Sequence, residues 1–202
     1  KGLSFSTTIS KTTFYRYIED GVLLTITNKD LPVKCNKDKQ KYDRVKPSRA
    51  PRGKSIEKRP EEINARSTFG HWEMDSVEGK KGTKKTLLVL TERKTRREII
   101  RLMKDKTAAS VVKALDGIEA EMGAEIFARV FHTITVDNGS EFTDYEGIER
   151  STLGEVKRTT VYFCHPYSSY ERGSNENQNK MIRRHYPKGY DFTSVTPADI
   201  RR

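Results

Sequence analysis

Short apolar runs of strand length punctuate the chain from about residue 67 onward. Residues 71–77, 85–92 and 97–103 each predict a strand, and the second is apolar at its centre, as buried strands are. Two short turns, one rich in Gly and Lys, separate these runs at hairpin-like lengths. Residues 133–137 and 160–164 predict two more strands.

Helical periodicity appears between and after these strands. An apolar stripe predicts a helix over residues 107–122, and it consists of Val111, Val112, Leu115, Ile118 and Met122. A second helix is expected over about residues 169–185, where Pro187 and Gly189 end it. The predicted order is three strands, a helix, a strand, a connection, a strand and a helix. This order indicates a mixed sheet with helices packed on it.

A shorter helical pattern lies near the start of the chain. Ser10 suits a helix N-cap and Gly21 a helix end, with apolar side chains three and four residues apart between them. The opposite face carries Lys11 and Arg16, which suits entry into a DNA major groove from a helix-turn-helix. An ordinary amphipathic helix fits the same pattern.

The composition of the chain indicates the class of its partner. The 202 residues are 34% hydrophobic and 33% charged, with a net charge of +11, which favours a polyanion such as nucleic acid. Residues 34–59 hold eleven Lys or Arg against three acidic residues, and Pro and Gly interrupt them. We interpret residues 28–66 as a basic linker with Arg49 and Arg52 as candidate DNA contacts. A solvated spacer is the alternative.

Several classes of protein are disfavoured. No apolar run approaches the eighteen residues of a membrane span, so no membrane partner is expected. Cys35 and Cys164 lie far apart and the four histidines lack mutual ligand spacing, so we expect neither disulfide nor zinc. The cytoplasm is the expected compartment. Because the chain starts at Lys1 and not at a methionine, we expect it to be a fragment.

Two aspartates stand where predicted strands emerge from the core, next to turn-forming residues. Asp75 follows Met74 on the first strand, and Asp137 closes the fourth just before Asn138 and Gly139. If these strands are neighbours, the two carboxylates lie close together and repel unless a cation separates them. Mg²⁺ prefers such oxygen ligands. Each aspartate alone is equally well explained as a surface carboxylate or as a turn cap.

A third carboxylate follows on the last predicted helix. Glu176, Lys180 and Arg183 are spaced i, i+4 and i+7, which gives one helix face a metal ligand and two phosphate-binding cations. Three carboxylates that hold two metal ions can catalyse displacement at phosphorus. Simple pairing of Glu176 with Lys180 is the alternative. Glu73 and Glu141 are rival carboxylates or supporting groups.

Several ordered strings resemble bacterial insertion-sequence transposases of the IS-thirty family. They are Gly70-His71-Trp72-Glu73-Met74-Asp75, Val136-Asp137-Asn138-Gly139-Ser140-Glu141-Phe142, Pro166-Tyr167-Ser168-Ser169, Glu171-Arg172-Gly173-Ser174-Asn175-Glu176-Asn177 and Pro187-Lys188-Gly189. Ser55-Ile56-Glu57-Lys58-Arg59-Pro60 resembles that family's lead-in to its catalytic core. The resemblance covers residues 55–192 and reaches back to the first helix.

The resemblance implies an RNase H-like core related in fold to retroviral integrases, here a mixed five-stranded sheet flanked by helices. It implies two Mg²⁺ or Mn²⁺ ions held by Asp75, Asp137 and Glu176, with Asp75 bridging both ions. The implied reaction is cleavage at the ends of the element and strand transfer into target DNA. The implied organisation is a helix-turn-helix remnant (1–27), a basic linker (28–66) and a C-terminally truncated core (67–202).

Partners and alternatives follow from this assignment. The expected partner is double-stranded DNA, with phosphate contacts from Arg172, Lys180, Arg183 and Arg184. Pairing two DNA ends requires a dimer or higher oligomer, and a bacterial transposase is expected at the nucleoid. A nuclease that cuts without joining and a non-catalytic DNA-binding remnant remain alternatives. Thirty-eight residues separate Asp137 from Glu176. This is more than the family typically has, and we assign the extra residues to the loop around residues 151–159.

Overall fold

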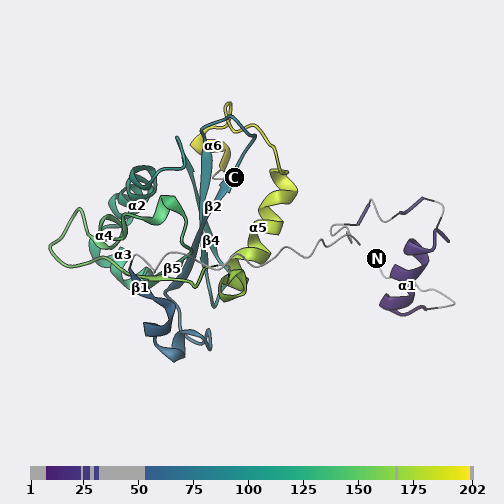
Figure 1. Cartoon of the computed structure of the whole chain (residues 1–202), viewed down its shortest axis with the longest axis horizontal. Helices are drawn as coiled ribbons and strands as arrows, with labels where there is room; N and C mark the ends of the chain where they lie inside the picture. The colour runs from purple at the N-terminus through teal and green to yellow at the C-terminus, as the bar shows by residue number, and fades with distance from the viewer. Residues whose placement is uncertain (1–7, 24, 28–29, 32–52, 167, 201–202) are drawn as a thin grey trace. The chain divides into compact units, whose positions relative to one another are not determined.

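The computed structural model describes residues 8–23, 25–27, 30–31, 53–166 and 168–200, and the chain forms two compact units, Lys1–Lys46 and Pro47–Arg202 (Figure 1). In the first unit, α1 (Lys11–Glu19) forms where the pattern predicts a helix. The hydroxyl of Ser10 accepts the backbone N–H of Thr13 at 3.1 Å, as an N-cap does. Ile18 is buried on this helix, while Lys11 and Arg16 are exposed.

The second unit is built on a six-stranded sheet in the order β1-β6-β5-β2-β3-β4. Its strands are β1 (Lys54–Ser55), β2 (His71–Glu78), β3 (Thr86–Glu92), β4 (Glu98–Met103), β5 (Thr133–Val136) and β6 (Thr160–Phe163). The strands β2, β3 and β4 pair antiparallel, whereas β5 pairs parallel with β2 and β6. This is the expected RNase H-like sheet. The sixth strand, β1, was not expected, and it pairs parallel with β6 at the edge.

Helices cover both faces of this sheet. They are α2 (Ala108–Met122), α3 (Ala124–Val130), α4 (Tyr145–Glu149), α5 (Gly173–His185) and α6 (Pro197–Ile200), with 3-10 turns η1 (Ile56–Lys58), η2 (Glu61–Ile63), η3 (Ser140–Phe142) and η4 (Ser169–Arg172). In Figure 1, α2, α3 and α4 lie on one side of the sheet and α5 lies on the other. Within the described part of the chain, no helix has the length and apolarity of a membrane span.

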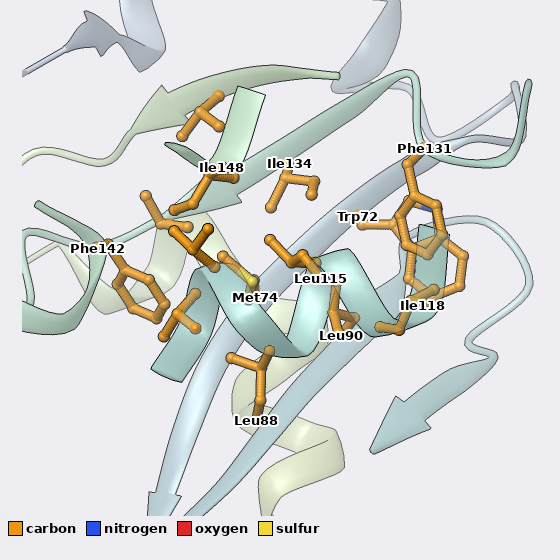
Figure 2. Close-up of a cluster of buried hydrophobic side chains, with 14 of the residues drawn as sticks. Trp72, Met74, Leu88, Leu90, Leu115, Ile118, Phe131, Ile134, Phe142 and Ile148 are labelled. Atoms are coloured by element: carbon orange, nitrogen blue, oxygen red, sulfur yellow. The ribbon is translucent and has the colours of Figure 1, made fainter. Parts of the chain in front are cut away.

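The main apolar core lies between the sheet and α2 (Figure 2). Alternate residues of each strand enter it, such as Met74 of β2 and Leu90 of β3, and both meet a cluster that includes Leu115 of α2. The indole of Trp72 stacks on the ring of Phe131 with centroids 4.6 Å apart. Trp72 is therefore a core residue, as its position on β2 predicts.

The other sheet face carries a smaller apolar cluster at one end and polar groups beside it. Val89 of β3 and Val77 of β2 pack there with Ile182 of α5 and with Phe192 and Val195 of the C-terminal segment. Because β3 is covered on both faces, all seven of its residues are buried. The remaining polar area over β2 and β5 is where the candidate site lies.

The loop of residues 151–159, to which the sequence analysis assigns extra residues, is tied to α2. The fully buried guanidinium of Arg158 donates to Asp116 at 2.8 Å and to Glu119 at 3.0 Å. Glu119 also accepts the backbone N–H of Thr152 at 3.0 Å. The loop is thus anchored at both ends by charged groups that lie under it.

Candidate active site

The two aspartates lie side by side because their strands are parallel neighbours. In the register of β2 and β5, Glu73 lies opposite Thr135, and two residues further along each strand are Asp75 and Asp137. Side chains two residues apart on a strand share a face. Asp75 and Asp137 therefore project from the same face, with Asp137 directly after the end of β5 and Asp75 inside β2 at the same level.

One guanidinium bridges the two carboxylates. Arg172 donates to Asp137 Oδ2 at 2.7 Å, and its Nη1 lies 3.5 Å from Asp75 Oδ1. The same Nη1 donates to the backbone oxygen of Met74 at 3.1 Å. Burial alone would lower the pKa of Arg172, but the charges of Asp75 and Asp137 outweigh it and leave that pKa raised. The pair of carboxylates thus shares one positive charge.

Further hydrogen bonds orient each carboxylate. Asn179 of α5 donates its side-chain N–H to Asp75 Oδ2 at 2.7 Å, and the backbone N–H of Ser76 donates to Asp75 Oδ1 at 2.9 Å. The backbone N–H of Gly139 donates to Asp137 Oδ1 at 2.8 Å. Asp75 has 22% of its side chain exposed and Asp137 has 41%, so both remain open to solvent and ligand.

The rival carboxylates serve as supports. Glu73 is fully buried and accepts Nη1 of Arg93 at 2.6 Å, so its charge is already compensated. Glu141 is 3% exposed and accepts the hydroxyl of Ser76 at 2.6 Å, which connects η3 to the strand that carries Asp75. Its Oε2 is buried without a partner among the described atoms.

Cys164 adjoins this site but does not suit a metal. It is buried, and burial raises the pKa of its thiol to about 12, although the charge of Arg172 acts in the opposite direction. Buried cysteines of this kind are structural, whereas reactive thiolates lie in partly exposed positions. The oxygen donors of Asp75 and Asp137 are therefore the ligand chemistry that this site offers.

Among the described side chains, the carboxylate oxygens of Asp75 and Asp137 are ligands that suit a hard divalent cation. Asp75 and Asp137 supply oxygen ligands that converge on a single positive group, as carboxylates around a cation do. Among the described side chains, no group of three His, Cys, Asp or Glu residues gathers as a metal site. The backbone of Glu176 lies in α5, and its side chain is outside the described part.

Curated relatives are similar in sequence to this chain over most of its length. The chain is 41% identical over 181 residues to a probable transposase for the insertion-like sequence element IS1161 from Streptococcus salivarius, which covers 89% of this chain and 48% of that protein. It is 40% identical over 146 residues to the IS4351 transposase of Bacteroides fragilis, covering 72% and 41%. It is 35% identical over 148 residues to the Escherichia coli transposase InsI for IS30C, covering 73% and 36%.

Over most of its length the chain is similar to insertion-sequence transposases, and these relatives include members of the IS30 (IS-thirty) family. It spans about half the length of the curated relatives it matches, or less. No model of a protein family matches it. Among solved structures, it resembles the catalytic core of bovine immunodeficiency virus integrase with a TM-score of 0.43 and 17% identity, covering 58% of this chain and 68% of that one. A simian T-cell lymphotropic virus intasome matches with a TM-score of 0.45 and 18% identity, covering 56% and 38%.

The predicted DNA contacts fall into different surroundings. Lys180 and Arg184 are exposed on α5, and Arg183 of the same helix is partly buried. Arg172 lies between the two aspartates and has 11% of its side chain exposed. Lys11 and Arg16 belong to the other unit, and Arg49 and Arg52 lie outside the described residues. Their DNA contacts stay predictions.

Two residues of the site were not predicted from the sequence. Asn179 was detectable, because it lies three residues after Glu176 and so shares its helix face. The buried Arg59 was not, because it belongs to a segment that reads as linker. Its Nη1 donates to the hydroxyl of Thr135 at 3.0 Å, beside the strand end that carries Asp137.

Proposed function

We propose that this chain is the catalytic portion of a DDE transposase, in which Asp75, Asp137 and Glu176 hold two Mg²⁺ or Mn²⁺ ions. The observation that carries the proposal is the pair of aspartates that the adjacent parallel strands β2 and β5 place on one face, compensated by one shared guanidinium. Glu176 completes the set from α5, the helix whose Asn179 already reaches Asp75. The family supplies the third ligand and the metal.

The residues have distinct tasks in this proposal. Asp75, Asp137 and Glu176 would together hold the two ions, with Asp75 as their shared ligand. Ions held there would supply activation of the attacking water or 3′-hydroxyl and stabilisation of the leaving oxygen at phosphorus. When cations compensate the carboxylates, the guanidinium of Arg172 is available to contact the phosphate instead, as predicted from the sequence.

The substrate of the proposed reaction is double-stranded DNA, first at the ends of the element and then at the target. The relatives are named for insertion-sequence elements, which supports this substrate class. Because two ends must be joined in one reaction, we propose a dimer or higher oligomer on DNA. A bacterial transposase that acts on DNA works in the cytoplasm at the nucleoid.

The test is a cleavage and joining assay on labelled element-end DNA with Mg²⁺ or Mn²⁺. We expect metal-dependent cleavage and joining that Asp75→Asn and Glu176→Gln each abolish. Glu125→Gln on α3, which removes one carboxylate from another helix, is the matched control and should keep full activity. Cleavage without joining would favour a nuclease. Activity in Glu176→Gln would refute that residue as the third ligand.

A further inference from the structure

A basic groove opens next to Asp75, at the end of the β2–β3 hairpin. It has a volume of about 800 Å³, and Ser76, the residue after Asp75, lines it. Its cationic lining residues are Lys80, Lys81, Lys84, Lys85, Lys106, Arg183 and Lys188. The single carboxylate in its lining, Glu78, is paired with Lys106 at 2.5 Å. The groove therefore carries a large positive surplus.

Specific contacts build the groove walls. The hairpin turn is fastened to the C-terminal segment, because the backbone N–H of Lys80 donates to Tyr190 O at 2.8 Å. The amino group of Lys85 donates to the backbone oxygens of Thr193 at 2.8 Å and Val195 at 2.9 Å. At Gly79, a Cβ would lie 2.6 Å from the ring of Phe192, so only glycine allows this close packing. These contacts join the hairpin directly to the C-terminal segment, whose Lys188 and Gly189 also line the groove.

The cations of the groove divide into two kinds. Lys85 and Lys106 are engaged in the contacts above, and burial of Lys106 is outweighed by Glu78 and Glu141, so its pKa is raised. By contrast, Lys80, Lys81, Lys84 and Lys188 are exposed and form no ion pair with a described residue. The charge of Lys80 contributes, after hydrogen bonds from Thr193, to a lowered pKa of Asp191 near the rim. Four lysines thus remain available for a ligand.

Arg183 adds an independent indication of a ligand. It reaches the groove from α5, and its Nη1 is buried with no hydrogen-bond partner among the described atoms. A buried N–H donor without an acceptor is costly and uncommon. A phosphate oxygen in the groove would supply that acceptor.

We propose that this groove binds the phosphate backbone of the DNA duplex next to the phosphate that reacts at Asp75 and Asp137. Lysine ammonium groups neutralise backbone phosphates whatever the base sequence, and none of the lining residues is aromatic, so base stacking is not available. The contact is therefore independent of sequence. The inference rests on the proposed function for its substrate, and it adds Lys80, Lys81, Lys84 and Lys188 to the DNA-binding surface.

The experiment measures binding of the full chain to a labelled DNA duplex in EDTA as salt is raised. Each lost phosphate contact should flatten the slope of log K against log salt by about 1, so Lys81→Gln/Lys84→Gln should flatten it by about 2 on duplexes of any sequence. The matched control Lys113→Gln/Arg129→Gln removes two exposed charges from α2 and α3 and should leave the slope unchanged. Thermal unfolding of both variants checks that these surface changes leave the fold intact.

The outcomes separate this inference from the proposed function. Equal slopes for the groove and control variants, with wild-type cleavage intact, would overturn the groove and leave the transposase proposal standing. A slope that changes only in the groove variant, together with cleavage that survives Asp75→Asn, would support the groove and overturn the transposase proposal. If the wild-type chain binds no DNA even at low salt, both are overturned. Competition by inorganic phosphate at concentrations comparable to DNA phosphate would show a simple anion site and overturn the backbone assignment.

Discussion

The two faces of the sheet differ in what their side chains do. Towards α2, β2 presents Trp72 and Met74, which are buried in the main apolar core. Towards α5, the same strand presents Glu73 and Asp75, which are matched by Arg93 and Arg172. Successive residues of one strand therefore serve stability and chemistry in turn.

This difference shows how the site stays open without weakening the fold. The apolar face is a closed cluster, so most of the stability should reside there. The other face balances its charges locally, with Arg93 for Glu73 and Arg172 shared by Asp75 and Asp137, and leaves Asp137 partly exposed. Substitutions on the two faces should consequently separate activity from stability.

The largest effect is expected on the α5 face. Asp75→Asn should reduce DNA cleavage by about ten-thousandfold, as losses of essential catalytic groups do, because a bridging metal ligand disappears. The free energy of unfolding should change by less than about 1 kcal/mol, since Arg172 keeps its pair with Asp137. Single-turnover cleavage and urea unfolding measure the two quantities. Loss of both together would contradict the division between the faces.

The buried arginine under the loop of residues 151–159 provides the next test. Arg158→Met leaves the fully buried Glu119 without its cation, which should cost about 3–5 kcal/mol. Urea unfolding at neutral pH gives the value. Glu119→Gln in the same background should recover part of the loss, because a neutral amide needs no counter-charge. A cost below about 1 kcal/mol would mean that solvent reaches Glu119.

A comparable loss is expected in the main core. Leu115→Ala opens a cavity among fully buried neighbours and should cost about 2–5 kcal/mol. Activity per folded molecule should stay near that of the wild type. Exposed Leu153→Ala is the matched control and should cost little. The comparison between the faces would weaken if Leu115→Ala lost activity while the protein remained folded.

Glu141 lies where the two kinds of surface meet. Glu141→Ala removes the acceptor of the Ser76 hydroxyl and a partner of Lys106, which should cost about 1–3 kcal/mol. Glu141→Gln keeps an acceptor oxygen for Ser76 and should cost less. Unfolding free energies of the two variants test this order. The reverse order would show that the hydrogen bond from Ser76 contributes no stability at this position.

The smallest effect concerns pH at the edge of the site. Hydrogen bonds to Glu171 and Glu57 raise the pKa of His165 above its usual value of about 6.5. The stability that protonated His165 contributes is therefore fully present at pH values below the pKa of His165 in the unfolded chain. It is lost as the pH rises through the raised pKa of His165 in the folded chain. The difference in unfolding midpoint between wild type and His165→Gln should shrink over this range. His185→Gln on α5 is the control, and a difference independent of pH would contradict the prediction.

Much of the fold and the first part of the site followed from local pattern. The alternation in β2 and β5 and the stripe of α2 predicted their elements, because side-chain period reports burial directly. The short strand β1 and the helices α3 and α4 were not predicted from the sequence, because a side-chain period does not emerge from two to seven residues. The position of Arg172 between the aspartates also escaped, because it depends on contacts 35 and 98 residues apart in the chain.

The sequence by itself determined which acidic residues the two strands carry, the basic character of the chain and its similarity to insertion-sequence transposases. Tertiary structure alone decided that Asp75 and Asp137 share one guanidinium and that Glu73 and Glu141 support them. It also decided that the lysines of the β2–β3 turn and Lys188 line one groove. The reason is physical: period and composition report how a residue meets its near neighbours and solvent, whereas charge pairing depends on which distant segments the sheet brings within a few ångströms.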